Sequence, residues 1–433
     1  MRKVLKVVGL VVAIALVCVS GLLAYGVGAW DRVVVSDVRH LNAPNDAASI
    51  ARGEFLYRDA LVCWSCHSDP AEPNPGSPPS GGREFNMMEV GPGFGMAWAT
   101  NLTSDDETGL GAWSDGELAR TIREGVDREG RLLFPIMESQ MYQGLSDDDV
   151  LALIAYLRTI PPVKNATKPY APTLAAKLLF TFMFKPMKHA TEPVRGPPPG
   201  ETVEYGRYLA WHVGMCVGCH TPRSPDDGQW DMTQPFAGGI FTIEEPTFGW
   251  TGSNLTPAEA GLGAWSEGQF LSLMREGTRP DRRVVIPAVM PWPSYAHWSD
   301  RDLKAVWKYL RTVAPVEHEV SPTRLARDAV AASGALRGRA LFATYCVSCH
   351  GRDGAGTPYT DAVMKEVATE QDDEDLAIAI QDGSETMPGF AETLDEGQRK
   401  DAIAYIRTFA PYAGPPAAAA PMQGGEGGAS GEK

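Results

Sequence analysis

The sequence predicts an all-α protein in which three related domains follow one another behind an N-terminal transmembrane helix. Three observations lead to this prediction. A Cys-x-x-Cys-His motif occurs three times, a long internal repeat surrounds the first two motifs, and each repeat ends in a helical pattern of apolar residues. The chain has 433 residues, which is more than one hydrophobic core usually serves, so several domains of roughly 100 to 150 residues are expected.

The first 30 residues are typical of a signal anchor. Arg2, Lys3 and Lys6 precede residues 7–30, an apolar run that contains no charged residue and is long enough to cross a bilayer. A cleavable signal usually has a shorter apolar region followed by a small-residue cleavage site, so an uncleaved anchor is favoured. Because positive residues stay in the cytoplasm, the remaining chain is expected in the periplasm of a bacterium, attached to the inner membrane.

Charge and cysteine usage narrow the possible classes. The chain has 39 Lys and Arg residues and 54 Asp and Glu residues, which gives a net charge of −15. No block of basic residues occurs outside the N-terminus. This balance argues against nucleic acid as a partner and suits a soluble acidic surface. Six of the seven cysteines belong to the three motifs. The seventh, Cys18, lies in the apolar run and is expected to behave as a small hydrophobe.

Alignment of the first two motifs reveals two copies of one long domain. Gly-Leu-Gly-Ala-Trp-Ser occurs at 109–114 and again at 261–266, and Asn-Leu-Thr occurs at 101–103 and at 254–256. The Asn-Leu-Thr segments also fit a glycosylation sequon, but their matched positions favour a structural loop. The third domain is shorter. The predicted boundaries are 1–30 for the membrane helix, 45–165 for the first domain, 166–199 for a linker, 200–317 for the second domain, 330–412 for the third domain and 413–433 for a disordered tail.

Each domain is expected to end in a helix with a readable start. The predicted N-caps are Ser146, Ser299 and Asp395, each with Asp or Gln three residues later. Two further helix starts have the capping-box pattern, Ser114 with Glu117 and Ser266 with Gln269. The apolar stripes that follow these caps are expected to be core.

The linker contains an apolar stretch at 174–184 that is too short to cross a membrane. Two interpretations remain open. The stretch either packs over the neighbouring domains or lies at the membrane interface together with Lys177, Lys185 and Lys188.

The three motifs predict three covalently bound haem c groups. The two cysteines of Cys-x-x-Cys-His can form thioethers with one haem while the adjoining histidine binds the iron. A zinc site or a redox dithiol would not explain a histidine directly after the second cysteine three times in an exported chain. The predicted attachment residues are Cys63, Cys66, Cys216, Cys219, Cys346 and Cys349, and the predicted proximal iron ligands are His67, His220 and His350.

Methionine is the usual sixth ligand of an electron-carrying haem with a positive potential. Met137 and Met290 stand equally far after the first cysteine of their motifs and equally far before the serine that begins the terminal helix. Met387 has a nearly matching place in the third domain. These three are the predicted distal ligands, with Met141 as an alternative to Met137. The other histidines, which show no repeat of position and are expected at the surface or in loops, are His40, His189, His212, His297 and His318. His297 lies near Met290 and could ligate in an altered state.

These features resemble the triheme cytochrome c subunits of membrane-bound periplasmic dehydrogenases, such as quinoprotein alcohol dehydrogenases and flavin-dependent gluconate or sorbitol dehydrogenases. The resemblance rests on Cys-Val-Gly-Cys-His-Thr-Pro-Arg at 216–223, on the repeated segments described above and on the apolar linker. It implies three class I cytochrome c domains and the haem attachment and ligation already predicted. It also implies electron transfer from a dehydrogenase catalytic subunit to membrane quinone or a terminal oxidase.

Three functional hypotheses follow. The leading one is an electron-transfer subunit that has no catalysis of its own. The second is an independent respiratory cytochrome between a quinol-oxidising complex and an oxidase. The third is a haem enzyme, such as a peroxidase or a thiosulfate-oxidising cytochrome, which needs an open or unusual sixth position. A methionine candidate for every haem argues against the third hypothesis.

Overall fold

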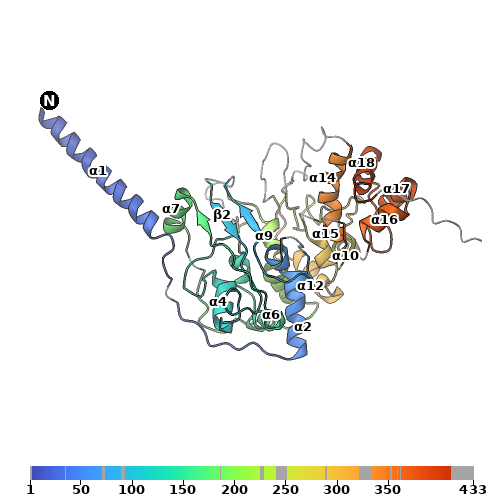
Figure 1. The fold of residues 1–433 in the computed structure, drawn as a ribbon, viewed down its shortest axis with the longest axis horizontal. Coiled ribbons are helices and arrows are strands. Elements are labelled where there is room, and N and C mark those ends of the chain that lie inside the picture. Colours follow the sequence, from blue (N-terminus) through green and yellow to red (C-terminus); the bar gives the residue numbers. More distant parts are fainter. Residues whose placement is uncertain are drawn as a thin grey trace, which may run out of the picture. The chain divides into compact units, whose positions relative to one another are not determined.

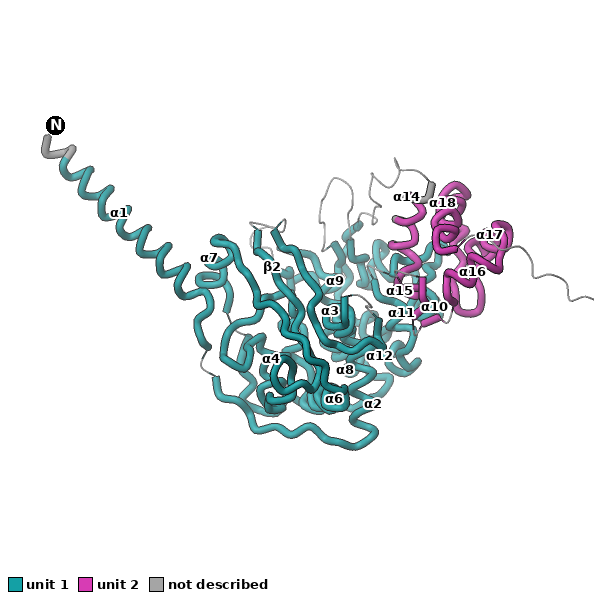
Figure 2. The backbone as a smooth tube through the Cα atoms, in the orientation of Figure 1, with its two compact units in different colours: residues 1–328 teal, residues 329–433 magenta. Residues whose placement is uncertain are grey.

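The computed structural model describes residues 2–34, 36–70, 74–88, 93–185, 187–224, 229–239, 251–287, 290–320, 334–351, 354–357, 359–360 and 362–410. These residues are rich in helix, and the chain divides into two compact units, Met1–Asp328 and Ala329–Lys433 (Figure 2). The first unit contains the first two repeats and the second unit contains the third. The predicted tail at 413–433 lies outside the described residues.

The chain begins with the long apolar helix α1 (Arg2–Gly28) (Figure 1). Within it, the 23 residues Lys6–Gly28 are long and apolar enough to cross a membrane. Such a helix so close to the N-terminus is a candidate membrane anchor or signal peptide.

The first repeat is built from short helices around its motif. They are α2 (Ala47–Phe55), the π-helical turn η1 (Leu56–Ala60), α3 (Trp64–His67), α4 (Asp115–Glu124), α5 (Ser139–Tyr142) and α6 (Asp147–Thr159). A small antiparallel sheet in the order β1-β2-β3 accompanies them, formed by β1 (Glu84–Asn86), β2 (Gly95–Trp98) and β3 (Ala171–Pro172). The all-α prediction omitted this sheet. Its strands are too short to give a period-two pattern, and the third strand comes from the linker.

The second repeat follows the same order. After α7 (Leu174–Phe182) in the linker come α8 (Val203–Tyr208), η2 (Leu209–Val213), α9 (Cys216–His220), α10 (Glu267–Glu276), α11 (Trp292–Tyr295) and α12 (Asp300–Leu310). The second unit contains α14 (Gly334–Leu341), η3 (Phe342–Cys346), α15 (Val347–His350), α16 (Met364–Glu370), α17 (Asp373–Asp382) and α18 (Glu396–Ile406).

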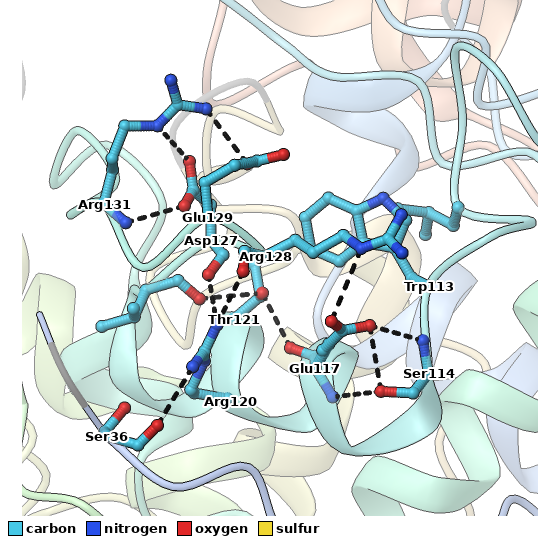
Figure 3. A network of polar contacts seen from close by, with 12 residues as sticks. Ser36, Trp113, Ser114, Glu117, Arg120, Thr121, Asp127, Arg128, Glu129 and Arg131 are labelled. Carbon is cyan, nitrogen blue, oxygen red and sulfur yellow. Dashed lines mark hydrogen bonds and ion pairs between the residues drawn. The ribbon is translucent and has the colours of Figure 1, made fainter. Parts of the chain in front are cut away.

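The predicted helix starts are confirmed. Ser114 accepts a hydrogen bond from the backbone N–H of Glu117 at 3.2 Å, and the Glu117 carboxylate accepts one from the backbone N–H of Ser114 at 2.7 Å (Figure 3). The same reciprocal box starts α10 and α18, and serine caps start α6 and α12. Gly125 ends α4 with a φ of +65°, a conformation that favours glycine.

The first and last helices of every repeat cross at a glycine. The crossings are α2 with α6 at Gly53, α8 with α12 at Gly206, and α14 with α18 at Gly338. At each of these glycines a Cβ atom would collide with a backbone carbonyl oxygen of the facing helix, in Ala152, Ala305 and Asp401 respectively. The two helices therefore approach closely only because the glycine has no side chain.

Replacing Gly206 by alanine is expected to destabilise the first unit by about 3 kcal/mol, because backbone cannot yield to the new methyl group as a flexible side chain would. Gly268→Ala in α10 is the matched control. The nearest atom to its new Cβ lies 4.0 Å away, so this change should be neutral or slightly stabilising. Thermal unfolding followed by circular dichroism compares the two variants. Equal melting temperatures would contradict the proposed close crossing.

The first two repeats share one hydrophobic core, and each packs its π-helical turn against a short helix of the other. The turn η2 of the second repeat packs on α5 of the first, and η1 of the first packs on α11 of the second. The indole N–H of Trp298 donates to the carbonyl of Asp59 at 2.8 Å, and the Tyr208 hydroxyl donates to the Asp149 carboxylate at 2.6 Å. The first two repeats are thus joined by a shared core and by hydrogen bonds in both directions.

Candidate haem sites

Each motif histidine ends a short helix that contains the second cysteine of its motif and follows a π-helical turn. The first cysteine begins α9, but it directly precedes α3 and α15. In α3 the backbone N–H groups of Cys66 and His67 donate to the carbonyl of Cys63 at 3.2 and 3.0 Å. This helical turn places two thiols that are three residues apart on one face, with the imidazole beside them. The second and third motifs have the same local arrangement, and none of the six motif cysteines belongs to a disulfide.

A backbone carbonyl orients each motif histidine. The Nδ1 atom of His67 lies 2.8 Å from the carbonyl oxygen of Thr100, and that of His220 lies 2.7 Å from the carbonyl of Ser253. In the second unit the corresponding distance, from His350 to Ala362, is 3.5 Å. Because a carbonyl only accepts, Nδ1 carries the proton and the Nε2 lone pair is left for a metal ion.

The histidines are also in the protonation state that ligation needs. Burial lowers the pKa of His67, His220 and His350 below the ordinary value, and the carbonyl hydrogen bonds only partly oppose this effect. A neutral imidazole is the form that binds iron. The electrostatics of the three sites therefore agree with their geometry.

The Asn-Leu-Thr segments hold the orienting carbonyls in place. Asn101 is only 2% exposed, and its side-chain amide donates to the carbonyl of Val163 at 2.7 Å while its oxygen accepts from Thr103. Asn254, which is 4% exposed, makes the same bonds to Val316 and Thr256. This burial confirms the structural loop predicted for both segments. The orienting residues themselves were not predicted, although Thr100 and Ser253 each directly precede an Asn-Leu-Thr segment.

The motif cysteines fit thioether bonds to haem. Burial raises the pKa of Cys63, Cys216 and Cys346 to about 12, and that of Cys219 and Cys349 to about 11. A thiolate is therefore disfavoured at these positions, whereas reactive dithiols and zinc sites use thiolates. A thioether sulfur carries no charge and can be buried without that cost. The protonated thiols and the oriented neutral imidazoles together fit covalent haem.

The candidate distal methionines lie in corresponding loops. The carbonyl of Met137 accepts from the N–H of Ser139 at 2.6 Å, and the carbonyl of Met290 accepts from the N–H of Trp292 at 2.7 Å. Both methionines are partly buried against the shared core, and each is separated by one residue from the short helix that follows, α5 or α11. Met387 lies in a turn of the second unit, where its N–H donates to the Ser384 hydroxyl at 3.2 Å.

Met141 lies at the boundary with the second repeat. Its sulfur would be 3.7 Å from a Cβ atom on Gly218, which belongs to the second motif, and its carbonyl accepts from Nδ1 of His212 at 2.9 Å. His212 was expected in a loop or at the surface, and this expectation is wrong. The residue is half-buried in η2, because that turn contributes to the contact between the repeats.

Three of the remaining histidines contact residues that are distant in the sequence. The ring of His297 lies 3.2 Å from the Asp59 carboxylate, and that of His189 lies 2.8 Å from Glu124. His318 donates to the carbonyl of Ala237 at 3.0 Å, and His40 is exposed.

Glu138 is a site residue that sequence reasoning missed. Burial raises its pKa to about 7, although the nearby positive charge of Arg223 in the second repeat acts in the opposite direction. The negative charge of Glu138 also contributes to the raised pKa of the Cys219 thiol. The carboxyl group therefore lies beside Met137 in the chain and close to the second motif in space. Its position directly after a candidate ligand was the available signal.

The fold and the sites have the features of a c-type cytochrome, the class of protein that carries haem and transfers electrons. Comparisons with known proteins agree with this class. Residues 333–406 match the family model described as cytochrome C oxidase, cbb3-type, subunit III.

The chain is also similar to cytochrome subunits of several dehydrogenases. It is 29% identical to the gluconate 2-dehydrogenase cytochrome c subunit of Pantoea cypripedii, over 84% of this chain and 86% of that protein. It is 27% identical to the cytochrome c subunit of the quinone alcohol dehydrogenase of Gluconobacter oxydans, over 84% and 78%. It is 26% identical to the fructose dehydrogenase cytochrome subunit of Gluconobacter japonicus, over 71% and 65%.

Proposed function

We propose that this chain is a triheme cytochrome c that transfers electrons from a periplasmic dehydrogenase to membrane quinone or a terminal oxidase. The observation that carries the proposal is the threefold occurrence of a Cys-x-x-Cys-His helix with an oriented histidine. Each would belong to one class I cytochrome c domain, at 45–165, 200–317 and 330–412. The chain would be anchored in the bacterial inner membrane by α1, with all three domains in the periplasm.

Each iron would have one histidine and one methionine ligand, His67 with Met137, His220 with Met290, and His350 with Met387. The matched backbone contacts of Met137 and Met290 support this pairing. The position of Met141 against Gly218 favours Met137 over Met141 in the first domain. With both axial positions filled by protein, no site is left for a substrate, which supports electron transfer rather than catalysis.

Bound haem iron supplies the one-electron chemistry, as it alternates between the ferrous and ferric states. The chain's own residues position it. Thioethers would fix the haem edge, the carbonyls of Thr100 and Ser253 would hold the imidazoles, and the shared core would exclude water. Because η1 and η2 interlock the first two repeats, the relay between them would keep one fixed geometry. A fixed geometry suits repeated transfer between the same two centres.

The similar proteins support a dehydrogenase catalytic subunit as the electron donor, since their names assign them to gluconate, alcohol and fructose dehydrogenases. The acceptor would be quinone in the membrane or a terminal oxidase.

Purification of the chain with its partners from native membranes tests this proposal. Gluconate, an alcohol or fructose, added one at a time, should reduce the haem bands of the purified complex, and an added quinone should reoxidise them. The matched control is the isolated chain, which these substrates should leave oxidised. Reduction by quinol alone, with a quinol-oxidising complex as the only co-purified partner, would contradict the dehydrogenase assignment and favour an independent respiratory cytochrome.

A further inference from the structure

The linker helix α7 has a buried face and exposed apolar side chains at its ends. On the buried face, the ring of Phe180 packs on Phe134 and Tyr170 with centroids 6.0 and 5.6 Å apart. Outside this face, Leu174 and Phe182 at the two ends of the helix, and Met183 directly after it, remain 60%, 50% and 64% exposed. Packing over the first repeat, one of the two interpretations of this stretch, is thus confirmed for one face only. These three residues present large apolar side chains to the surroundings.

The C-terminal end of α7 adjoins the end of the candidate membrane helix. The Thr181 hydroxyl donates to the carbonyl of Gly26 at 2.7 Å, and Arg32 donates to the carbonyl of Thr181 at 2.8 Å. The rings of Tyr25 and Phe182 have centroids 6.2 Å apart. A side chain on Gly26 would collide with Leu178, so glycine permits this close approach. The helix α7 is therefore fastened to the last turn of α1.

The position of this contact along α1 corresponds to a membrane boundary. Gly26 lies roughly 30 Å along the helix from Lys6, which is about the thickness of the hydrocarbon core. With Lys6 at one boundary, the contact with α7 falls at the other. Tyr25 and Trp30 flank this point, and aromatic residues of this kind are enriched at membrane interfaces.

Along the linker sequence that contains α7, the charged side chains have one sign. In a chain with a net charge of −15, no acidic residue occurs between Asp149 and Glu192. The same stretch carries five lysines, Lys164, Lys168, Lys177, Lys185 and Lys188. Lys177 lies with its ammonium group 5.6 Å from the ring centre of Trp30, and Lys185 and Lys188 are exposed. A local positive charge beside exposed apolar side chains suits anionic lipid.

We propose that α7 is a second membrane contact, in which Leu174, Phe182 and Met183 enter the interfacial layer of the bilayer and the lysines meet anionic headgroups. The inference rests on the proposed role of α1 as a membrane anchor. It adds a function for the linker, because two contacts fix which face of the first repeat is turned to the membrane. Phe134 connects this contact to the candidate ligand loop, since its carbonyl accepts from the N–H of Met137 at 3.1 Å.

The test uses the full, haem-loaded chain in vesicles of phosphatidylcholine and phosphatidylglycerol. The substitution Cys18→Ser removes the one cysteine outside the motifs, and the motif cysteines do not react with a label because they are bonded to haem. In this background Met183→Cys is the single labelling site and carries an environment-sensitive fluorophore. Brominated lipids should lower its emission roughly two-fold relative to unbrominated vesicles, a ratio that cancels quenching by haem. Met232→Cys is the matched control, a methionine 47% exposed on the second repeat, and its emission should not change.

A third label distinguishes the proposed membrane contact of α7 from the proposed anchor role of α1. Leu16→Cys, in the middle of α1, should be strongly quenched if α1 spans the bilayer. Quenching at position 16 without quenching at position 183 would overturn the membrane contact of α7 and leave the anchor intact. No quenching at position 16 would overturn the anchor itself.

The role of charge has its own measurement. Combining Lys177→Gln, Lys185→Gln and Lys188→Gln with the label at position 183 should weaken its quenching in vesicles that contain phosphatidylglycerol. Quenching equal to that of the unsubstituted labelled chain would refute the part assigned to anionic lipid.

Discussion

Replacing Cys216 and Cys219 together by serine is expected to lower the haem content from three to two and to unfold most of the first unit. Both thioethers proposed for the second haem would be lost, and α9 could no longer hold it. Val217 in this helix is fully buried in the core that both long repeats share, and Trp298 lies against the turn before the motif. Loss of the cofactor should therefore weaken the first repeat as well as the second.

Two controls accompany this variant. Cys18→Ser changes an exposed cysteine of α1 and should leave three haems. Cys346→Ser with Cys349→Ser should also remove one haem but leave the melting of the first unit unchanged, because the third repeat forms a compact unit of its own. Haem is counted by intact mass and by the pyridine haemochrome spectrum. Three haems in the Cys216 and Cys219 variant would contradict the assignment of this motif.

Replacing Met387 by alanine is expected to remove the distal ligand of the third haem. The weak red absorption band of ferric haem with methionine ligation should lose about a third of its intensity, since one of three such haems is affected. The midpoint potential of one haem should also fall, because methionine sulfur stabilises the ferrous state relative to the ferric state.

Met364→Leu is the matched control for this change. Met364 is buried in the same unit, and leucine preserves most of its volume, so the red band should keep its full intensity. An undiminished band in Met387→Ala would show that another group binds the third iron.

The features that local sequence determines were predictable. The N-caps of α6, α12 and α18 depend on one side chain and the backbone three residues later, so a short pattern identified them. The motif residues share a single helical turn, and their spacing alone indicated haem. The loop role of Asn101 and Asn254 followed from their matched positions in the repeat.

The features that depend on distant contacts were not predictable. The carbonyl of Thr100 accepts from His67 across a separation of 33 residues. Because every residue has a backbone carbonyl, the residue type does not reveal which one accepts this hydrogen bond. The hydrogen bond between the two long repeats joins Asp59 to Trp298, which are 239 residues apart. His212 was misplaced for the same reason, because its half-burial comes from the first repeat rather than from its own neighbours.

The proposal of three haems, each with one histidine and one methionine ligand, is tested most directly by a redox titration of the full chain purified in detergent and followed in the visible and red regions. We predict three one-electron transitions, each low-spin and each accompanied by loss of part of the red methionine band on reduction. Fewer than three transitions, or a high-spin component in the resting ferric protein, would contradict it.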